Sequence, residues 1–183
     1  MTKVTREAVI DRLMSVFRRH GYQGASMSEL ANATGLGKSS LYHHFPGGKD
    51  DMALAVLDHV RQWLDEHVVK IAAGDGTPKA KLAAITERLA AFYENGREPC
   101  LLGALAAGGA RANLQAPLRE AFQMLIAAFT ALGIEGGAPK AKARLAAEDA
   151  VLRIQGALIL SAGLDDPSPF RHVLERLPKD ILG

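Results

Sequence analysis

Cysteine, tryptophan and long apolar runs are nearly absent from this sequence. Among its 183 residues there is one cysteine, Cys100, and one tryptophan. A single cysteine excludes an internal disulfide framework and fits a reducing cytoplasm. The longest apolar run, residues 156–164, is far shorter than the roughly 18–20 residues that a membrane span needs. No basic and apolar signal segment precedes the first expected helix. We therefore expect a cytoplasmic protein with no membrane partner.

Neither sign of charge is in large excess, because the formal net charge is only +2. Its distribution is more informative than its total. Residues 1–50 carry seven Lys or Arg against four Asp or Glu, whereas the rest of the chain carries fifteen against sixteen. A positive excess confined to one segment is the pattern of a surface that meets nucleic acid. This excess is too small to indicate nucleic-acid binding without a supporting sequence motif.

The alternating pattern of β-strands is missing as well, and no internal repeat is present. Apolar residues instead recur at intervals of three and four, which is typical of helices that bury one face. We expect an all-α fold with helices at the following positions: residues 6–20, 27–34, 38–44, 50–73, 78–95, a short helix from 99 that fails by Gly108-Gly109, 117–133, 139–164, and a last helix capped by 167–169.

Residues 26–49, SMSELANATGLGKSSLYHHFPGGK, contain two short helices around a glycine turn. Ser26 and Glu29 have the spacing of a capping box, so a helix should begin near Met27. Residues 35–37, Gly-Leu-Gly, should end it, and a second helix should run from Lys38 to His44. This is the pattern of a helix-turn-helix unit, and the helix at residues 6–20 would complete it as a third member.

Residues 35–51, GLGKSSLYHHFPGGKDD, preceded by HGYQGAS, resemble the N-terminal DNA-binding domain of TetR/AcrR-type transcriptional regulators. The Leu-Tyr-x-His-Phe core ahead of a lysine is specific to that family, and the resemblance covers roughly residues 5–60. The Pro-Gly-Gly-Lys turn and the later Cys-Leu-Leu-Gly segment are similar to the LmrA/YxaF-like subgroup. The resemblance implies a DNA-binding domain over residues 1–48, then a helical-bundle effector-binding and dimerisation domain over residues 49–183.

The polar residues of the helix-turn-helix are the candidates for DNA contacts, because a recognition helix exposes such side chains to the major groove. They are Ser26, Ser28, Lys38, Ser39, Ser40, Tyr42, His43, His44 and Lys49. The resemblance singles out Lys38, Ser39, Tyr42, His43 and Lys49. Lys49 begins a helix, where backbone N–H groups and a cation together favour a phosphate. Capping alone would explain Ser26 equally well, and Tyr42 could pack partly inward. Without the family motif, a plain interaction module would be an equal reading.

The C-terminal part is expected to form a dimer and to bind a ligand. The helix over residues 139–164 is apolar nearly all round from Ile154 onward, so it and the last helix should pair with a second copy of the chain. The resemblance implies a homodimeric repressor that binds a palindromic operator and is released by a small hydrophobic effector. Candidate pocket residues are the bulky or soft ones of the central helices: Trp63, His67, Phe92, Tyr93, Cys100, Phe122 and Met124. Each of them is otherwise an ordinary core residue.

Two other functions were weighed against this one. An enzyme lacks support, because no catalytic motif or phosphate-binding loop is present and the paired acids look like solvated helix faces. His43 and His44 are adjacent and diverge on a helix, while His59 and His67 are too far apart to chelate, so we expect no metal and no cofactor. A redox sensor would act through Cys100, which follows Pro99 near Arg97, but such a thiol must be exposed.

Overall fold

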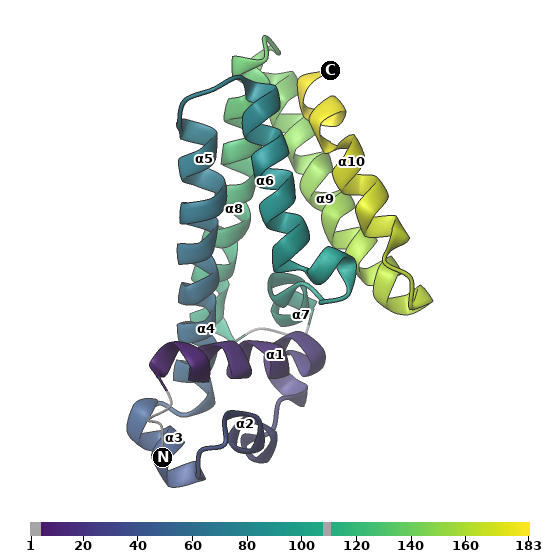
Figure 1. Ribbon diagram of the computed structural model, residues 1–183. Helices are drawn as coiled ribbons and strands as arrows, with labels where there is room; N and C mark the ends of the chain where they lie inside the picture. Colours follow the sequence, from purple (N-terminus) through teal and green to yellow (C-terminus); the bar gives the residue numbers. More distant parts are fainter. Residues whose placement is uncertain (1–4, 108–110) are drawn as a thin grey trace. The chain divides into compact units, whose positions relative to one another are not determined.

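The computed structural model describes residues 5–107 and 111–183, and every regular element in these ranges is helical (Figure 1). The expected all-α fold is confirmed. Contacts divide the chain into two compact units, one with residues 1–61 and 101–119 and one with residues 62–100 and 120–183. Across the described ranges, no helix has both the length and the apolar character required to cross a membrane.

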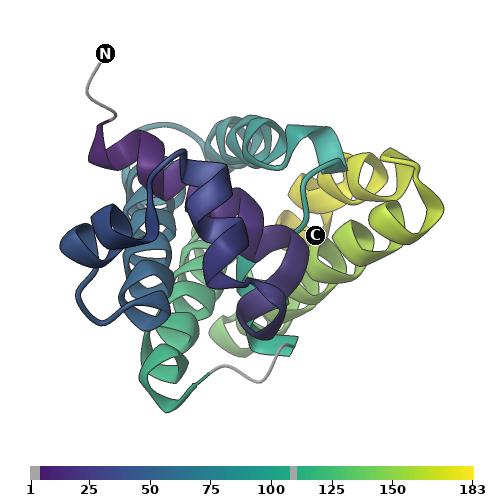
Figure 2. The same cartoon turned by 90° about the horizontal axis from the view of Figure 1, so that it is seen from below.

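The first unit is built on a three-helix core. Its members are α1 (Arg6–Gly24), α2 (Met27–Thr34) and α3 (Lys38–His44), the purple and dark blue helices of Figure 2. The start of α4 (Lys49–Leu64), the short α7 (Leu101–Ala107) and the first residues of α8 (Ala112–Glu135) complete it. Fully buried side chains from four of these helices meet in its core: Leu13, Phe17, Leu30, Leu41 and Met52.

Glycine at position 21 ends the regular part of α1, as the sequence predicts. Its backbone is non-helical, with φ 61° and ψ −172°, and one further turn follows to Gly24. A Cβ at Gly21 would lie 3.0 Å from the carbonyl oxygen of Ala104 on α7. Only glycine combines this positive φ with so close an approach of two backbones.

The second unit is a bundle of long helices. It contains the end of α4, a π-helical stretch (Asp65–Val69), α5 (Lys70–Ala73), α6 (Pro78–Phe92), a 3-10 turn (Glu94–Gly96), most of α8, α9 (Lys140–Leu164) and α10 (Ser168–Leu182). The bounds of α9 agree with the prediction. Phe170, Leu174 and Leu177 of α10 are buried as expected. The predicted helix over residues 78–95 ends at Phe92, because Glu94 and Asn95 adopt positive φ.

The helix expected over residues 50–73 is interrupted by the π-helical stretch. Met52, Val56 and Val60 are buried, and regular helical spacing would place Trp63, His67 and Ile71 next on the same face. Trp63, His67 and Ile71 are only half-buried, and the buried positions are instead Leu64, Val68 and Ala72. The N–H of Lys70 bonds to the carbonyl of Asp65, five residues back. A turn of this kind takes more residues than an α-helical turn, so it changes which side chains face inward.

Proline at position 117 does not begin a helix, contrary to the prediction. It lies inside α8, which starts at Ala112. Leu114 and Leu118 are both buried, so the turn before the proline packs inward and extends the helix backwards. Gly133 does not end α8 either. Its missing side chain leaves room for Ala143, whose Cβ would be 3.0 Å from a Cβ there. The expected failure of the preceding helix at Gly108-Gly109 falls outside the described residues.

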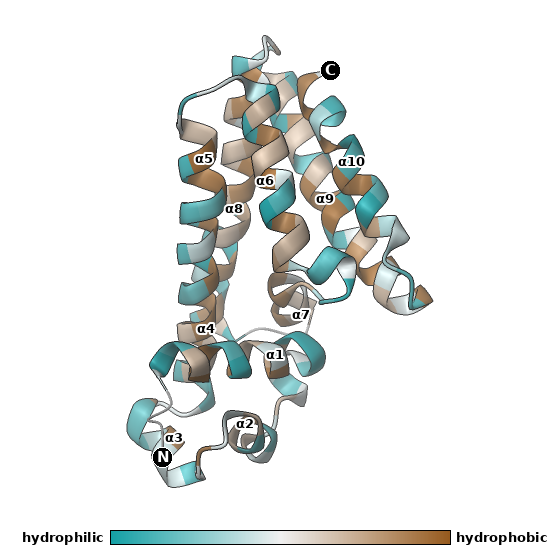
Figure 3. Ribbon diagram, in the orientation of Figure 1, coloured by the Kyte–Doolittle hydropathy of each residue, from teal (hydrophilic) through white to brown (hydrophobic). Residues whose placement is uncertain are grey.

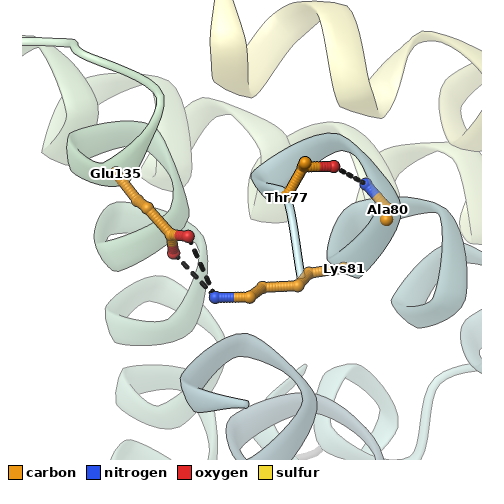
Figure 4. Close-up of polar contacts among 4 residues, drawn as sticks. All are labelled: Thr77, Ala80, Lys81 and Glu135. Carbon is orange, nitrogen blue, oxygen red and sulfur yellow. Dashed lines mark hydrogen bonds and ion pairs between the residues drawn. The ribbon is translucent and has the colours of Figure 1, made fainter. Parts of the chain in front are cut away.

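The start of α6 is fixed by a cap and by a buried charge (Figure 4). Thr77 accepts a hydrogen bond from the N–H of Ala80 at 3.3 Å, and Pro78 is the first helical residue, as predicted. One turn on, the ammonium group of Lys81 is buried and bonds to both carboxylate oxygens of Glu135, at the end of α8. No sequence pattern predicts this pair, which connects α6 to α8.

Large apolar side chains are exposed along one face of α9. Most of the exposed large hydrophobic residues of the described chain lie there: Leu145, Leu152, Ile159, Leu160 and Leu164. The outer face of α10 differs, because its exposed residues are charged or polar, as Figure 3 shows in teal. The surplus apolar surface that the sequence predicts for both terminal helices is therefore carried by α9.

Candidate nucleic-acid interface

The helix α2 begins and ends as its sequence predicts. The N–H of Glu29 donates to the hydroxyl of Ser26 at 3.1 Å, and the N–H of Ser26 donates to the Glu29 carboxylate at 2.8 Å. This reciprocal pair is a capping box. It also holds the pKa of Glu29 below its ordinary value, mainly through the backbone hydrogen bond of Ser26. Gly35 ends the helix in the left-handed region, with φ 70°. The cap leaves the Ser26 and Ser28 side chains exposed.

The helix α3 presents a polar surface to solvent and one apolar anchor to the core. Leu41 is fully buried and Phe45, which follows the helix, is 2% exposed. Every other side chain of α3 is exposed: Lys38, Ser39, Ser40, Tyr42, His43 and His44. Tyr42 is 49% exposed, and its ring edge lies close to Gly48. The inward packing considered for Tyr42 is thus limited to an edge contact with the turn after α3.

A side chain of α1 holds the turn between α2 and α3. The guanidinium of Arg12 donates to the carbonyl oxygen of Thr34 at 2.8 Å. The Thr34 hydroxyl is buried and donates back to Leu30 and Ala31. The last carbonyls of a helix are partial negative charges, so a cation there is favourable. The sequence pattern showed Arg12 only as a surface charge, and its partner lies 22 residues away.

The start of α4 places Lys49 beside the end of α1. Its ammonium group lies 4.6 Å from the centre of the Tyr22 ring and 3.5 Å from the Gln23 carbonyl oxygen. Partial burial, the largest cause, lowers the pKa of Lys49. The backbone at this helix start is less available than the sequence suggests. Gly47 donates its N–H to the Asp51 carboxylate at 2.6 Å. A phosphate bound here would therefore rely on the Lys49 side chain more than on that amide.

Beside Lys49, a carboxylate joins α1 and α4 to Arg111, the residue before α8. Asp50 accepts a hydrogen bond from the Tyr22 hydroxyl through one oxygen, and from the Arg111 guanidinium at 3.0 Å through the other. Burial, followed by the hydrogen bond to Asp50, raises the pKa of Tyr22 to about 12. The hydrogen bond from Tyr22 is the main cause that lowers the pKa of Asp50. Spacing along the chain could not reveal this network, because Arg111 is 61 residues from Asp50.

These residues surround a concave surface that encloses a volume of about 480 Å³. Its lining combines DNA-contact candidates with the newly found network: Tyr22, Tyr42, Gly48, Lys49, Asp50 and Arg111. The exposed face of α3 and this surface both belong to the first unit. They bring Tyr42 and Lys49 to one surface, whereas Ser26 and Ser28 lie at the start of α2. A capped helix, a glycine turn and a short helix with a polar exposed face define a helix-turn-helix DNA-binding protein.

The second unit brings together five of the seven predicted pocket residues. Trp63 and Phe92 stack with ring centres 4.1 Å apart, and His67 lies 5.0 Å from Trp63. Phe92 meets Tyr93 edge-on, and the Tyr93 hydroxyl lies 3.4 Å from the Cys100 sulfur. This series of contacts from α4 to Cys100 forms an aromatic cluster.

The other two predicted pocket residues, Phe122 and Met124, are half-buried on α8. Met124 lines a groove of about 290 Å³ between α5 and α8. Every lining residue of this groove is apolar: Val69, Ala72, Ala73, Met124, Ala127, Ala128 and Ala131. The sequence analysis did not predict this groove, because its candidates were bulky side chains, whereas the groove is open where the small side chains of alanines line it.

The residues considered for redox chemistry and metal binding are placed unfavourably. Cys100 is 7% exposed, so its thiol lacks the exposure that a redox sensor requires. It lies just before α7 and not within its first turn. In the parts of the chain that the structure describes, no cluster of three or more His, Cys, Asp or Glu side chains has an arrangement suited to a metal ion.

Comparison with known proteins gives the family. The family described as "Bacterial regulatory proteins, tetR family" matches residues 9–56, and "Transcriptional regulator LmrA/YxaF-like, C-terminal domain" matches residues 78–176. The chain belongs to the TetR family of transcriptional regulators, with an LmrA/YxaF-like C-terminal domain. It is a DNA-binding regulator and not an enzyme, and the predicted family and subgroup are confirmed.

Relatives resemble the chain over nearly its whole length. The transcriptional regulator LmrA of Bacillus subtilis is 22% identical over 182 residues, which cover 97% of this chain and 96% of LmrA. A TetR regulator from Legionella pneumophila has the same fold, with a TM-score of 0.86, 17% identity and 98% of each chain covered. The regulator CifR, solved with 26-bp double-strand operator DNA, matches with a TM-score of 0.75, 18% identity and 98% coverage of each chain.

Proposed function

We propose that this protein is a homodimeric transcriptional repressor that binds a palindromic operator and is released by a small hydrophobic effector. The observation that carries the proposal is the surface of α3, where Leu41 is fully buried while all six other side chains are exposed. A helix anchored by one residue and polar elsewhere suits insertion into the major groove, which is about 12 Å wide. The solved complex of the structural relative CifR with operator DNA supports this reading.

Within the interface we assign two kinds of contact. Lys38, Ser39, Ser40, Tyr42, His43 and His44 would face base edges and the adjacent backbone. Lys49, with Ser26 and Ser28 at the start of α2, would hold phosphates. Ser26 already accepts the Glu29 N–H, but its own O–H is still available to donate to a phosphate oxygen. On this assignment residues 1–48 act as the DNA-binding domain, and Lys49 begins the effector-binding and dimerisation domain.

Dimerisation would use the apolar face of α9. Leu145, Leu152 and Ile159 recur every seven residues and are 67%, 69% and 74% exposed. Gly156 lies between them, and a Cβ there would meet nothing within 4 Å. Leucines and isoleucines at heptad spacing with a glycine between them suit the close packing of a second helix. Two-fold symmetry of such a dimer implies a palindromic site with half-sites about one helical turn apart or somewhat more.

The effector would be small and apolar. The groove between α5 and α8 offers about 290 Å³ with no polar side chain in its lining. Trp63 and His67, on the helical run that continues into α5, supply aromatic surface together with Phe92 of α6. An effector releases DNA only if it binds the DNA-incompetent arrangement more tightly, by a coupling of about 1–3 kcal/mol. Aromatic drugs, flavonoid-like molecules and lipid-derived metabolites have suitable chemistry.

Selection of bound sequences from random duplex DNA by the purified protein tests this function. We expect an enriched palindrome, together with a mass from light scattering of twice the chain's 19.5 kDa. A thermal-shift screen of hydrophobic compounds would then find the effector, because a ligand that binds only the folded protein raises its melting temperature. A monomer that binds no duplex at low salt would overturn the proposal.

A further inference from the structure

The ion pair between Asp50 and Arg111 places an acid beside a group proposed to bind DNA phosphate. Asp50 follows Lys49 directly in the chain, and both line the concave surface that also contains Tyr42. A carboxylate at this position would repel phosphates unless a cation balanced it. The Arg111 guanidinium lies 3.0 Å from one Asp50 oxygen, and the Tyr22 hydroxyl donates to the other.

We propose that Arg111 and Asp50 are positioning residues for DNA binding: Arg111 neutralises Asp50, and Asp50 in turn holds the Tyr22 ring beneath Lys49. This inference rests on the proposed contact of Lys49 with phosphate. Three contacts connect these residues in series, from Arg111 to Asp50, from Asp50 to Tyr22, and from Tyr22 to the Lys49 ammonium at 4.6 Å. Each link orders the next, so the Lys49 ammonium has a fixed place.

The charges of these residues determine whether loss of Arg111 weakens or strengthens DNA binding. Lys49 and Arg111 bring two positive charges to the concave surface and Asp50 brings one negative charge. The net charge of the three is therefore positive only while Arg111 is present. The Arg111 side chain is 61% exposed, whereas that of Asp50 is 25% exposed. An exposed ion pair contributes little to stability. We therefore infer that the pair matters for the electrostatic potential at this surface more than for folding.

A charge-rescue experiment tests the proposal on the full-length protein. Affinity for a random-sequence duplex is measured at low salt for the wild type and for Arg111→Ala, Asp50→Asn and the double variant. We expect Arg111→Ala to weaken binding about fivefold, the factor that one unit charge a few ångström away gives in water. Asp50→Asn should restore most of that loss when added to Arg111→Ala. Structural damage would not be repaired in this way.

The matched control is Arg119→Ala, which removes an exposed arginine from α8, the helix that follows Arg111, outside the concave surface. It should change affinity less than twofold, within the usual range for an exposed charge remote from the contact. A loss as large as that of Arg111→Ala, or no rescue by Asp50→Asn, would overturn the proposal. Circular dichroism of each variant checks folding, and Arg111→Gln replaces Arg111→Ala if the latter unfolds.

A second readout separates this proposal from the proposed function. Phenolate absorbance follows the titration of Tyr22, with Tyr22→Phe identifying its share of the signal. Asp50→Asn should lower the pKa of Tyr22 from about 12 toward 10.0, because a negative neighbour is removed. If the wild type binds no DNA while this shift occurs, the network exists and the DNA-binding function is wrong. If the wild type binds DNA and neither the shift nor the rescue occurs, the network is wrong.

Discussion

The ammonium group of Lys81 lies 2.9 Å and 3.0 Å from the two carboxylate oxygens of Glu135 (Figure 4). The Lys81 side chain is 8% exposed and that of Glu135 is 42% exposed. The pair therefore has one buried member and one that solvent still reaches. A buried ammonium without a partner is costly, because water no longer stabilises its charge.

Glu135→Ala should lower the free energy of unfolding by about 1–3 kcal/mol, less than for a fully buried pair because Glu135 is partly solvated. Lys81→Met should cost less than Glu135→Ala, since it removes the charge along with the partner. Urea unfolding followed by circular dichroism measures both. The exposed pair of Lys70 and Glu66 on α5 and the preceding turn is the control, and Lys70→Met should leave the free energy of unfolding nearly unchanged. Equal effects of all three substitutions would contradict this account.

Ser26→Ala should destabilise the first unit by about 1 kcal/mol, because it removes the acceptor for the Glu29 N–H. Ser28→Ala is the matched control, since Ser28 is an exposed serine two residues further on, inside the first turn of α2. Thermal unfolding compares the two. DNA affinity distinguishes a Ser26 that only caps α2 from one that also contacts a phosphate. A loss of affinity in Ser26→Ala that exceeds the effect of its lower stability would show a phosphate contact.

Lys49→Ala should weaken binding to all duplexes alike and reduce the slope of log affinity against log salt by about one unit. Tyr42→Ala and Lys38→Ala should instead weaken the selected operator more than random DNA, because they remove contacts in the major groove. Fluorescence anisotropy at several salt concentrations measures both quantities. Equal losses on operator and random DNA for Tyr42→Ala would rule out base reading by that residue.

The hydrogen bond from Tyr22 to Asp50 predicts a loss of stability at high pH. The pKa of Tyr22 is about 12 in the folded protein, against an ordinary value of 10.0. Since the folded pKa is the higher one, this contribution is complete below pH 10 and is lost as the pH rises through about 12. Between these values the unfolded chain releases the proton and the folded protein keeps it. Tyr22→Phe should remove this part of the pH dependence, and an unchanged slope would contradict the assignment.

Leu152→Glu or Ile159→Glu should convert the proposed dimer into a monomer, because each would place a charge in the centre of an apolar contact. Light scattering and sedimentation measure the mass. Operator affinity should fall at the same time, since two linked reading heads bind far more tightly than one. The control is Glu87→Lys, an exposed site on α6. A dimer that survives both α9 substitutions would place the contact elsewhere.

The local features of the first unit were predictable because their signals lie close together in the sequence. Ser26 and Glu29 are three residues apart, and the glycines at 21 and 35 adopt the positive φ that ends each helix. The exposed and buried residues of α3 also follow from helical periodicity alone. Each of these predictions depends on interactions within one or two turns, where residue type decides the geometry.

Features that depend on distant partners were not predictable in this way. No sequence pattern predicts the pairing of Arg111 with Asp50 or of Lys81 with Glu135. Pro117 misled the prediction because a proline resembles a helix start, while the buried Leu114 extends the helix before it. The groove between α5 and α8 was not predicted for a related reason. Its space comes from alanines on two helices, which look like ordinary helix formers until both helices are in place.

The π-helical stretch from Asp65 to Val69 has a consequence for insertions and deletions. In an α-helix each residue turns the chain by about 100°, so a buried column at intervals of four drifts around the axis. The buried residues Leu64, Val68 and Ala72 keep that interval without drifting out of the core. Removing one residue between 65 and 69 would shorten the interval from Leu64 to Ala72 from eight residues to seven, which is two ordinary α-helical turns, so the buried column would be kept without the π-helical stretch. A chain shorter by that one residue should therefore still direct the alanines of α5 into the groove.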